Sequence, residues 1–121
     1  MIQNIELGKK GEELAVGYLQ KLRYKILERN YRCKFGEIDI IALDRKTVVF
    51  VEVKTRSSKE FGSPQTGVTL RKQRQLAKVA LSYLQKHHLF NRDARFDVVA
   101  VEKDCGEERI NMIRNAFEVS R

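Results

Sequence analysis

Two neighbouring apolar runs, residues 38–43 and 48–53, constrain the fold of this chain more than any other feature. Both are rich in Ile and Val, and the short polar segment 44–46 separates them, which predicts an antiparallel β-hairpin in the core. Each run nevertheless contains a carboxylate, Asp39 in the first and Glu52 in the second. Because burying an unpaired charge costs several kcal/mol, these acids need either partners or a function.

The register of the hairpin decides whether the charged residues meet. Glu52 and Lys54 project from one face of their strand, because side chains alternate along a strand. If residues 45–46 form a two-residue turn, Asp39 stands opposite Glu52. A slip by two residues pairs Glu37 with Glu52 and leaves Asp39 as a diagonal neighbour, whereas a slip by one sends Asp39 to the other face. Two of these three registers bring the acids together.

Two amphipathic helices are predicted, one near the start of the chain and one in its second half. Asn4 can cap the first helix, and Thr69 can cap the second, which fades near His87 and His88. The apolar positions at helical spacing are Leu14, Ala15, Tyr18, Leu19 and Leu22 in the first helix and Leu76, Ala77, Ala80, Leu81 and Leu84 in the second.

The remaining strands complete an α/β pattern. Residues 24–31 and 95–102 have strand patterns, residues 109–117 form a weaker last strand or a tail, and residues 57–67 read as a loop. The order is α-β-β-β-α-β-(β). A helix between two strands usually makes a parallel crossover, so we expect a mixed β-sheet flanked by helices. No linker or repeat interrupts the chain, which predicts a single domain over residues 1–121.

The charge balance favours a polyanionic partner. The 121 residues include 24 Lys and Arg against 16 Asp and Glu, a net charge of +8, which favours nucleic acid over an anionic membrane. Cys33 and Cys105 are far apart, so neither a zinc framework nor a disulfide scaffold is expected, and free thiols point to a reducing compartment. The first residues lack the apolar core of a signal peptide, and we expect a cytoplasmic protein without a membrane span.

The two acids and the lysine suggest metal-dependent chemistry. Like charges at cross-strand distance repel each other, and a divalent cation would remove that conflict. Carboxylate oxygens suit Mg²⁺ or Mn²⁺. Lys54 could then orient or deprotonate an attacking water, or stabilise the charge on a phosphorane. The alternative is structural: Glu52 and Lys54 form a solvated ion pair on an edge strand, and Asp39 caps a loop or pairs with an arginine.

At these residues the sequence resembles known nucleases. "GEID" followed by "VEVK" resembles the PD-(D/E)XK signature of the restriction-endonuclease-like fold, which Holliday junction resolvases share. The chain also resembles the YraN-like family of small bacterial proteins over nearly its whole length. The segments that carry this resemblance are "GKKGEELA" (8–15), "NYRCKFGEIDIIA" (30–42), "VFVEVKTR" (49–56), "FGSP" (61–64) and "RFDVV" (95–99).

The resemblance implies a role for each residue of the motif. It implies a nuclease-like fold with Asp39 and Glu52 as metal ligands and Lys54 as the catalytic lysine. Glu12 matches an acid of the first helix that can assist the metal site in resolvase-like relatives; on the sequence alone it is as readily a favourable first-helix acid. The proline of the signature is missing, since Glu37 or Ile38 stands before Asp39.

Cations gather at the start of the second helix, where the helix macrodipole disfavours them. Cations placed against the helix dipole often mark a functional surface. The alternative interpretation is that these residues only form a solvated face of the helix. The candidate nucleic-acid-binding residues are Lys9, Lys10, Arg56, Arg71, Lys72 and Arg74.

The leading hypothesis is a Mg²⁺- or Mn²⁺-dependent endonuclease on DNA, including branched or damaged forms. It would work as a homodimer if two strands are cut. The second hypothesis is a non-catalytic nucleic-acid-binding module, for which residues 8–11 resemble the basic GxxG clamp of KH domains. The third is an adaptor that acts through protein contacts and carries a vestigial site.

Overall fold

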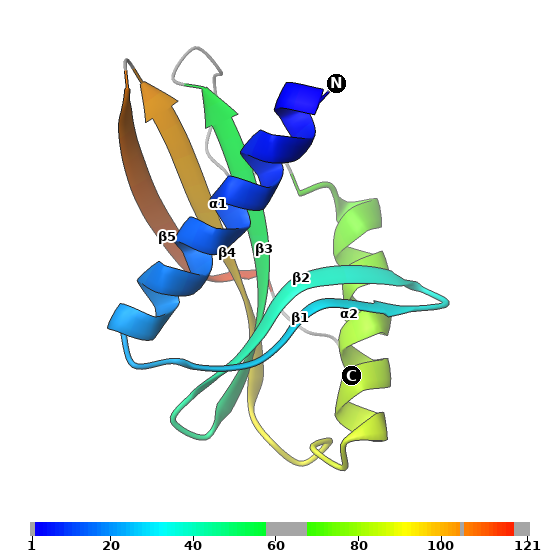
Figure 1. Cartoon of the computed structure of the whole chain (residues 1–121). Coiled ribbons are helices and arrows are strands. Elements are labelled where there is room, and N and C mark those ends of the chain that lie inside the picture. Colours follow the sequence, from blue (N-terminus) through cyan, green and yellow to red (C-terminus); the bar gives the residue numbers. More distant parts are fainter. Residues whose placement is uncertain (1, 58–67, 105, 118–121) are drawn as a thin grey trace.

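Five strands and two helices form the part of the chain that the structure describes (Figure 1). The computed structural model describes residues 2–57, 68–104 and 106–117, without the side chains of residues 2–8, 57 and 104. The elements are α1 (Ile2–Lys21), β1 (Lys25–Cys33), β2 (Gly36–Asp44), β3 (Thr47–Ser57), α2 (Leu70–Lys86), β4 (Ala94–Asp104) and β5 (Glu107–Phe117). The "FGSP" segment and Cys105 lie outside the described residues.

One mixed sheet contains all five strands in the order β1-β2-β3-β4-β5. Neighbouring strands are antiparallel except β3 and β4, which are parallel and are joined through α2. Figure 1 shows a strongly twisted sheet, in which the β1–β2 hairpin runs across the direction of β3, β4 and β5. This arrangement confirms the predicted α/β fold class and element order, and the segment after β4 is a full strand rather than a tail.

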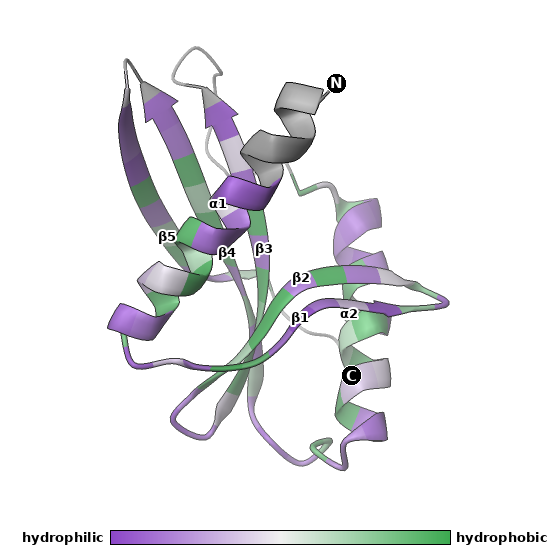
Figure 2. Ribbon diagram, viewed as in Figure 1, coloured by the Kyte–Doolittle hydropathy of each residue, from purple (hydrophilic) through white to green (hydrophobic). Residues whose placement is uncertain are grey.

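Each helix covers a core on its own face of the sheet. The α2-side core includes Phe50, Phe96 and Leu84, and the α1-side core includes Leu19 and Val51. Figure 2 shows hydrophobic residues along the central strands and hydrophilic residues over much of the outer strand β5. Apolar residues on both faces of β3 and β4 therefore reflect burial by two helices, as in other sheets covered on both sides.

Glycine lets α1 approach the sheet closely. A Cβ built on Gly11 would collide with Oγ1 of Thr55 on β3, so a larger residue at this position would press against the strand. The first helix therefore needs a residue without a side chain at its contact with β3.

Two predictions about the helices were wrong. Helix α1 begins at Ile2, so Asn4 lies inside the helix and does not cap it. In α2 the buried residues are Leu76, Val79, Ala80, Tyr83 and Leu84. Val79 and Tyr83 take the places predicted for Ala77 and Leu81, because the spacing of three and four residues from Leu76 runs through them.

The ends of α2 are as predicted. The side chain of Thr69 accepts a hydrogen bond from the backbone N–H of Lys72 at 3.2 Å, and His87 is the C-cap residue.

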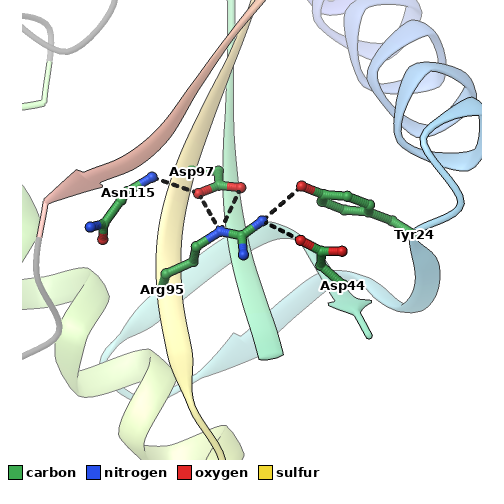
Figure 3. A network of polar contacts seen from close by, with 5 residues as sticks. All are labelled: Tyr24, Asp44, Arg95, Asp97 and Asn115. Carbon is green, nitrogen blue, oxygen red and sulfur yellow. Dashed lines mark hydrogen bonds and ion pairs between the residues drawn. The ribbon is translucent and has the colours of Figure 1, made fainter. Parts of the chain in front are cut away.

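A polar network links several strands at one end of the sheet, where β2 turns into β3 (Figure 3). Arg95 Nε donates to both carboxylate oxygens of Asp97, at 3.1 and 3.2 Å, and its Nη2 donates to Tyr24 and Asp44. Asp97 is fully buried and also accepts the backbone N–H of Asn115 at 2.8 Å. The network thereby ties Tyr24, which directly precedes β1, to β2, β4 and β5. Its charges are paired, as buried charges must be.

Candidate active site

The acidic site forms where β2 separates from β3. Asp44 stands opposite Thr47 across a two-residue turn, and the paired residues continue to Ile40 and Val51, which is the first of the three predicted registers. The next pair would be Asp39 and Glu52, but the ladder ends there. Instead, Oδ2 of Asp39 accepts a hydrogen bond from the backbone N–H of Val53 at 2.8 Å. The carboxylate of Asp39 thus occupies the gap between the two strands.

An irregularity in β1 and β2 accompanies this gap. Asn30, which lies between the paired residues Arg29 and Tyr31, has a φ of 53°, in the left-handed region. In β2, Ile38 contributes to the α2-side core while Ile40 contributes to the α1-side core, although strict alternation would place both on one face. Asp39 lies between them, at the point where the strand changes face.

Glu52 is buried beside Asp39. Its side chain is 10% exposed. Burial, a side-chain hydrogen bond with Asp39 and the negative charge of Asp39 raise the pKa of Glu52 to about 8, and Lys72 and Lys54 partly oppose this. The pair therefore holds a proton at neutral pH, as expected for two close carboxylates. Oε2 of Glu52 is buried without a hydrogen-bond partner, and its ion-pair contact is Lys72 Nζ at 3.7 Å.

Glu12 approaches the same pair from α1. Burial and then the negative charge of Asp39 raise the pKa of Glu12, while a side-chain hydrogen bond with Asn30 and the charge of Arg29 lower it. The neighbouring Glu13 instead forms a surface ion pair with Arg29 at 2.7 Å. Asp39 therefore acts electrostatically on both Glu52 and Glu12, and Lys54 acts on Glu52, which brings the four predicted catalytic residues into one region.

The predicted nucleic-acid-binding residues divide into four groups. Lys72 faces Glu52, whereas Arg71 and Arg74 line a separate hollow on the outer side of α2. Lys10 pairs with Glu108 of β5 at 3.1 Å, and Arg56 pairs with Glu102 of β4 at 2.9 Å. Lys9 is exposed on α1.

Sequence reasoning missed Lys72 as a neighbour of the acids and Asn30 as a partner of Glu12. No signal in the sequence pointed to the contact of Lys72, because Lys72 and Glu52 lie in different elements, 20 residues apart in the chain. For Asn30 the sequence held only a weak signal: asparagine tolerates the left-handed conformation that this residue adopts.

The donor set fits a hard divalent cation. Within the ranges that the structure describes, no group of three or more His, Cys, Asp or Glu side chains is placed to hold a metal ion. Mg²⁺, however, is usually held by one or two carboxylates together with waters and substrate phosphate. Asp39 and Glu52 supply two carboxylates, and the unpartnered Oε2 of Glu52 is an oxygen that such a cation would satisfy.

The fold and site define an α/β protein with a buried pair of acids at the point where β2 and β3 stop pairing. The chain belongs to the uncharacterised protein family UPF0102, whose family model matches residues 11–101. A UPF0102 protein of Geobacter metallireducens is 54% identical over 119 residues, which cover 98% of each chain. Another, from Caldicellulosiruptor saccharolyticus, is 52% identical over 114 residues, covering 93% of this chain and 97% of the relative.

Among solved structures, SfsA of Pyrococcus furiosus in complex with Ca²⁺ aligns with a TM-score of 0.40 and 15% identity. The alignment covers 92% of this chain and 62% of the SfsA chain. Separately, no helix in the described part of the chain is both long and apolar enough to cross a membrane.

Proposed function

We propose that this protein is a metal-dependent nuclease that hydrolyses phosphodiester bonds in DNA. The observation that carries the proposal is the buried carboxylate of Glu52, which stands beside Asp39 and has one oxygen without a hydrogen-bond partner. A protein gains no stability by burying a second carboxylate against the first. The arrangement is understandable if the pair binds a divalent cation during function.

In this proposal Asp39 and Glu52 hold Mg²⁺ or Mn²⁺. The cation would polarise a phosphoryl oxygen and lower the pKa of a bound water, which are the contributions that such ions make to hydrolysis. The hydrogen bond from Val53 fixes one oxygen of Asp39 and leaves the other for the ion. Burial fixes Glu52 in the same way, so the two ligands are held in place before the ion binds.

Lys54 lies next to this pair and supplies a positive charge. It projects from the face of β3 that bears Glu52, and its charge lowers the pKa of that residue. In the reaction, Lys54 orients the attacking water or stabilises the negative charge that builds on the phosphorane. The water oxygen bonds to phosphorus while the bond to the 3′ oxygen breaks. The attacking water releases a proton to the solvent and the 3′ oxygen takes one from it, so the products carry 5′-phosphate and 3′-hydroxyl ends.

Glu12 and Lys72 act on the site through their charges. Glu12 adds a carboxylate beside Asp39 and so increases the attraction of the site for a cation. Lys72 Nζ lies 3.7 Å from Glu52 and partly compensates that charge. The net charge of +8 supports DNA as the partner. Cutting both strands of a duplex would require two copies of the site, and we expect a homodimer for such a substrate.

A cleavage assay tests the proposal. Linear, nicked and four-way DNA would be incubated with Mg²⁺ or Mn²⁺ and either the wild-type protein or the variants Asp39→Asn, Glu52→Gln and Lys54→Ala. The amide oxygen introduced by Asp39→Asn can still accept the hydrogen bond from Val53, so this variant keeps the fold while removing the charge. Glu13→Gln is the matched control, because Glu13 lies on the surface beside Glu12 in the same helix.

We expect cleavage by the wild-type protein and by Glu13→Gln, and a loss of at least about a hundredfold in each site variant. Equal activity in the wild-type protein and Asp39→Asn would refute the proposal. Nucleic-acid binding that ignores divalent ions, without cleavage, would favour the binding-module hypothesis. The absence of any affinity for nucleic acid at low salt would favour the adaptor.

A further inference from the structure

A basic groove runs between the outer side of α2 and the tip of the β1–β2 hairpin. Two adjoining hollows of about 480 and 560 Å³ share three lining residues, Lys34, Phe35 and Lys78. The hollow nearer the start of α2 adds Arg71 and Arg74. The other extends toward the end of the helix. Among the residues that the structure describes, no acid lines either hollow.

The cations of this groove are uncompensated within the described part of the chain. Lys34, Arg71, Arg74, Lys78 and Lys86 form no ion pair with any other described residue. Helix α2 itself, from Leu70 to Lys86, contains no Asp or Glu. Like charges on one face repel one another, and two of these cations lie in the first turns of a helix, where the dipole disfavours them. A polyanion lying in the groove would relieve both costs.

The groove also presents an aromatic ring. Phe35 is 38% exposed, although a large apolar side chain gains by being buried. The Lys34 ammonium lies 5.2 Å from the centre of the ring. A base stacked on Phe35 would use the face of the ring that Lys34 does not cover, or would displace that side chain, and in both cases the ammonium would lie near the phosphate of the base.

Contacts between the hairpin and the helix hold Phe35 in position. Gln75 of α2 donates a hydrogen bond to the backbone carbonyl of Phe35 at 2.9 Å. Gly36 follows with a φ of +145°, and a Cβ at this position would lie 2.9 Å from the Gln75 amide nitrogen. Because the backbone is fixed while the ring stays exposed, the ring is available to a ligand at little cost in ordering.

We infer that this groove binds single-stranded DNA, with phosphates on the cations of α2 and an unpaired base stacked on Phe35. Residues 71–86 span roughly 22 Å along the helix, which is comparable to a short single-strand site of about four nucleotides. A duplex would offer the same phosphates, but its bases are stacked on one another and cannot cover the ring. The exposed ring thus distinguishes a single strand from a duplex.

The elements that line the groove also supply residues around the acidic pair. Arg71 precedes Lys72, which contacts Glu52, and Phe35 lies four residues before Asp39 in the chain. If the protein is the nuclease proposed above, on which this step rests, the substrate carries a single-stranded segment next to the cleaved bond. Frayed, gapped or branched DNA has this feature.

Tryptophan fluorescence can report the stacked base directly, because the chain contains no tryptophan. Phe35→Trp would place the sole indole in the groove, and Phe90→Trp is the matched control, at an exposed phenylalanine that lines neither hollow. Both variants would be titrated with oligothymidylate in the presence of EDTA. We expect quenching in Phe35→Trp and little change in Phe90→Trp. Binding without quenching in Phe35→Trp would overturn the assignment.

Affinity measurements provide the second test. Phe35→Leu should weaken binding of oligothymidylate by between about fivefold and 150-fold, while its binding of duplex DNA changes little. The double variant Arg74→Gln/Lys78→Gln should reduce the slope of log affinity against log salt by about 1.4 for the single strand. Duplex DNA or polyglutamate bound as tightly as oligothymidylate by the wild-type protein would refute the inference.

These measurements separate the groove from the nuclease, because EDTA excludes cleavage. Quenching and a Phe35-dependent affinity in a protein that never cuts DNA would support the groove and refute the nuclease. Cleavage of DNA by a protein whose affinity for a single strand is unchanged in Phe35→Leu would do the reverse.

Discussion

The buried pair of acids makes stability depend on pH in a way that one substitution should remove. Glu52→Gln keeps the size of the side chain and removes its ionisable group. In the wild-type protein the pKa of Glu52 is raised from 4.5 to about 8 in the folded state, chiefly by burial and by Asp39. Below pH 4.5 the residue is protonated whether the protein is folded or unfolded. Between the two values it ionises on unfolding, so folding becomes less favourable as pH rises.

The size of this effect follows from the two pKa values. Each pH unit between 4.5 and about 8 lowers the free energy of unfolding by up to about 1.4 kcal/mol. The limiting loss is roughly 5 kcal/mol, and we expect about 2–5 kcal/mol because Asp39 and Glu52 share the charge and their surroundings can relax. Glu52→Gln should therefore gain stability relative to the wild-type protein as pH rises to about 8, with no further gain above it.

Urea denaturation followed by far-ultraviolet circular dichroism, at several pH values on both sides of this range, measures the difference. Adding Mn²⁺ should stabilise the wild-type protein most at high pH, where the acids are ionised, and should have little effect on Glu52→Gln. Glu13→Gln controls for the loss of a surface charge. Parallel pH dependences for the wild-type protein and Glu52→Gln would refute the reasoning, because they would mean that Glu52 is not buried against another carboxylate.

Three further predictions concern other contacts. Gly11→Ala should destabilise the protein by about 1–3 kcal/mol, because its methyl group collides with Thr55; thermal unfolding measures this. Asp97→Asn should cost about 1–3 kcal/mol in urea denaturation, because it removes the charge of the buried carboxylate that Arg95 contacts through Nε, while Asp44 still pairs with the same arginine. Lys72→Gln should move the pH dependence assigned to Glu52 to higher pH, and by more than Lys54→Gln, because Lys72 opposes the raised pKa more strongly.

Each of these predictions has a control. Gly17→Ala, in the same helix with open space around it, should be neutral or stabilising, and Thr55→Ala should rescue Gly11→Ala. A Gly11→Ala protein as stable as the wild type would contradict the close packing. Asp93→Asn alters an exposed carboxylate and should cost little stability. Equal losses of stability in Asp93→Asn and Asp97→Asn would contradict the role of Asp97 in the polar network. Arg71→Gln should leave the pH dependence unmoved, since its side chain lines the groove on the outer side of α2.

Much of the fold could be predicted because its signals are local. The two apolar runs, the polar turn at residues 45–46 and the cap at Thr69 lie within a few residues of the contacts they make. The order of elements then implied a mixed sheet. The first helix illustrates the limit of such signals, since Asn4 has the chemistry of a cap but α1 continues through it to Ile2. A capping residue is used only where neighbouring contacts end the helix.

The candidate site could be predicted only in part, because its contacts join distant segments. The spacing of Asp39, Glu52 and Lys54 predicted an acidic pair and a lysine on two adjoining strands. It could not give the break in alternation around Asp39 or the hydrogen bond from Val53, because both depend on how β2 twists away from β3. The buried pairing of Arg95 with Asp97 was missed for the same reason, since it is completed by residues from other strands.

The sequence by itself determined which chemical groups are available: a basic chain with two acids and a lysine set in apolar strands. The tertiary structure alone decided how they are used. It buries Glu52 against Asp39 and turns Lys72 toward them, while Arg71 and Arg74 face a different hollow. The physical reason is that pKa values and ion pairs depend on burial and on distances between side chains. Those quantities are fixed only when strands and helices far apart in the chain pack together.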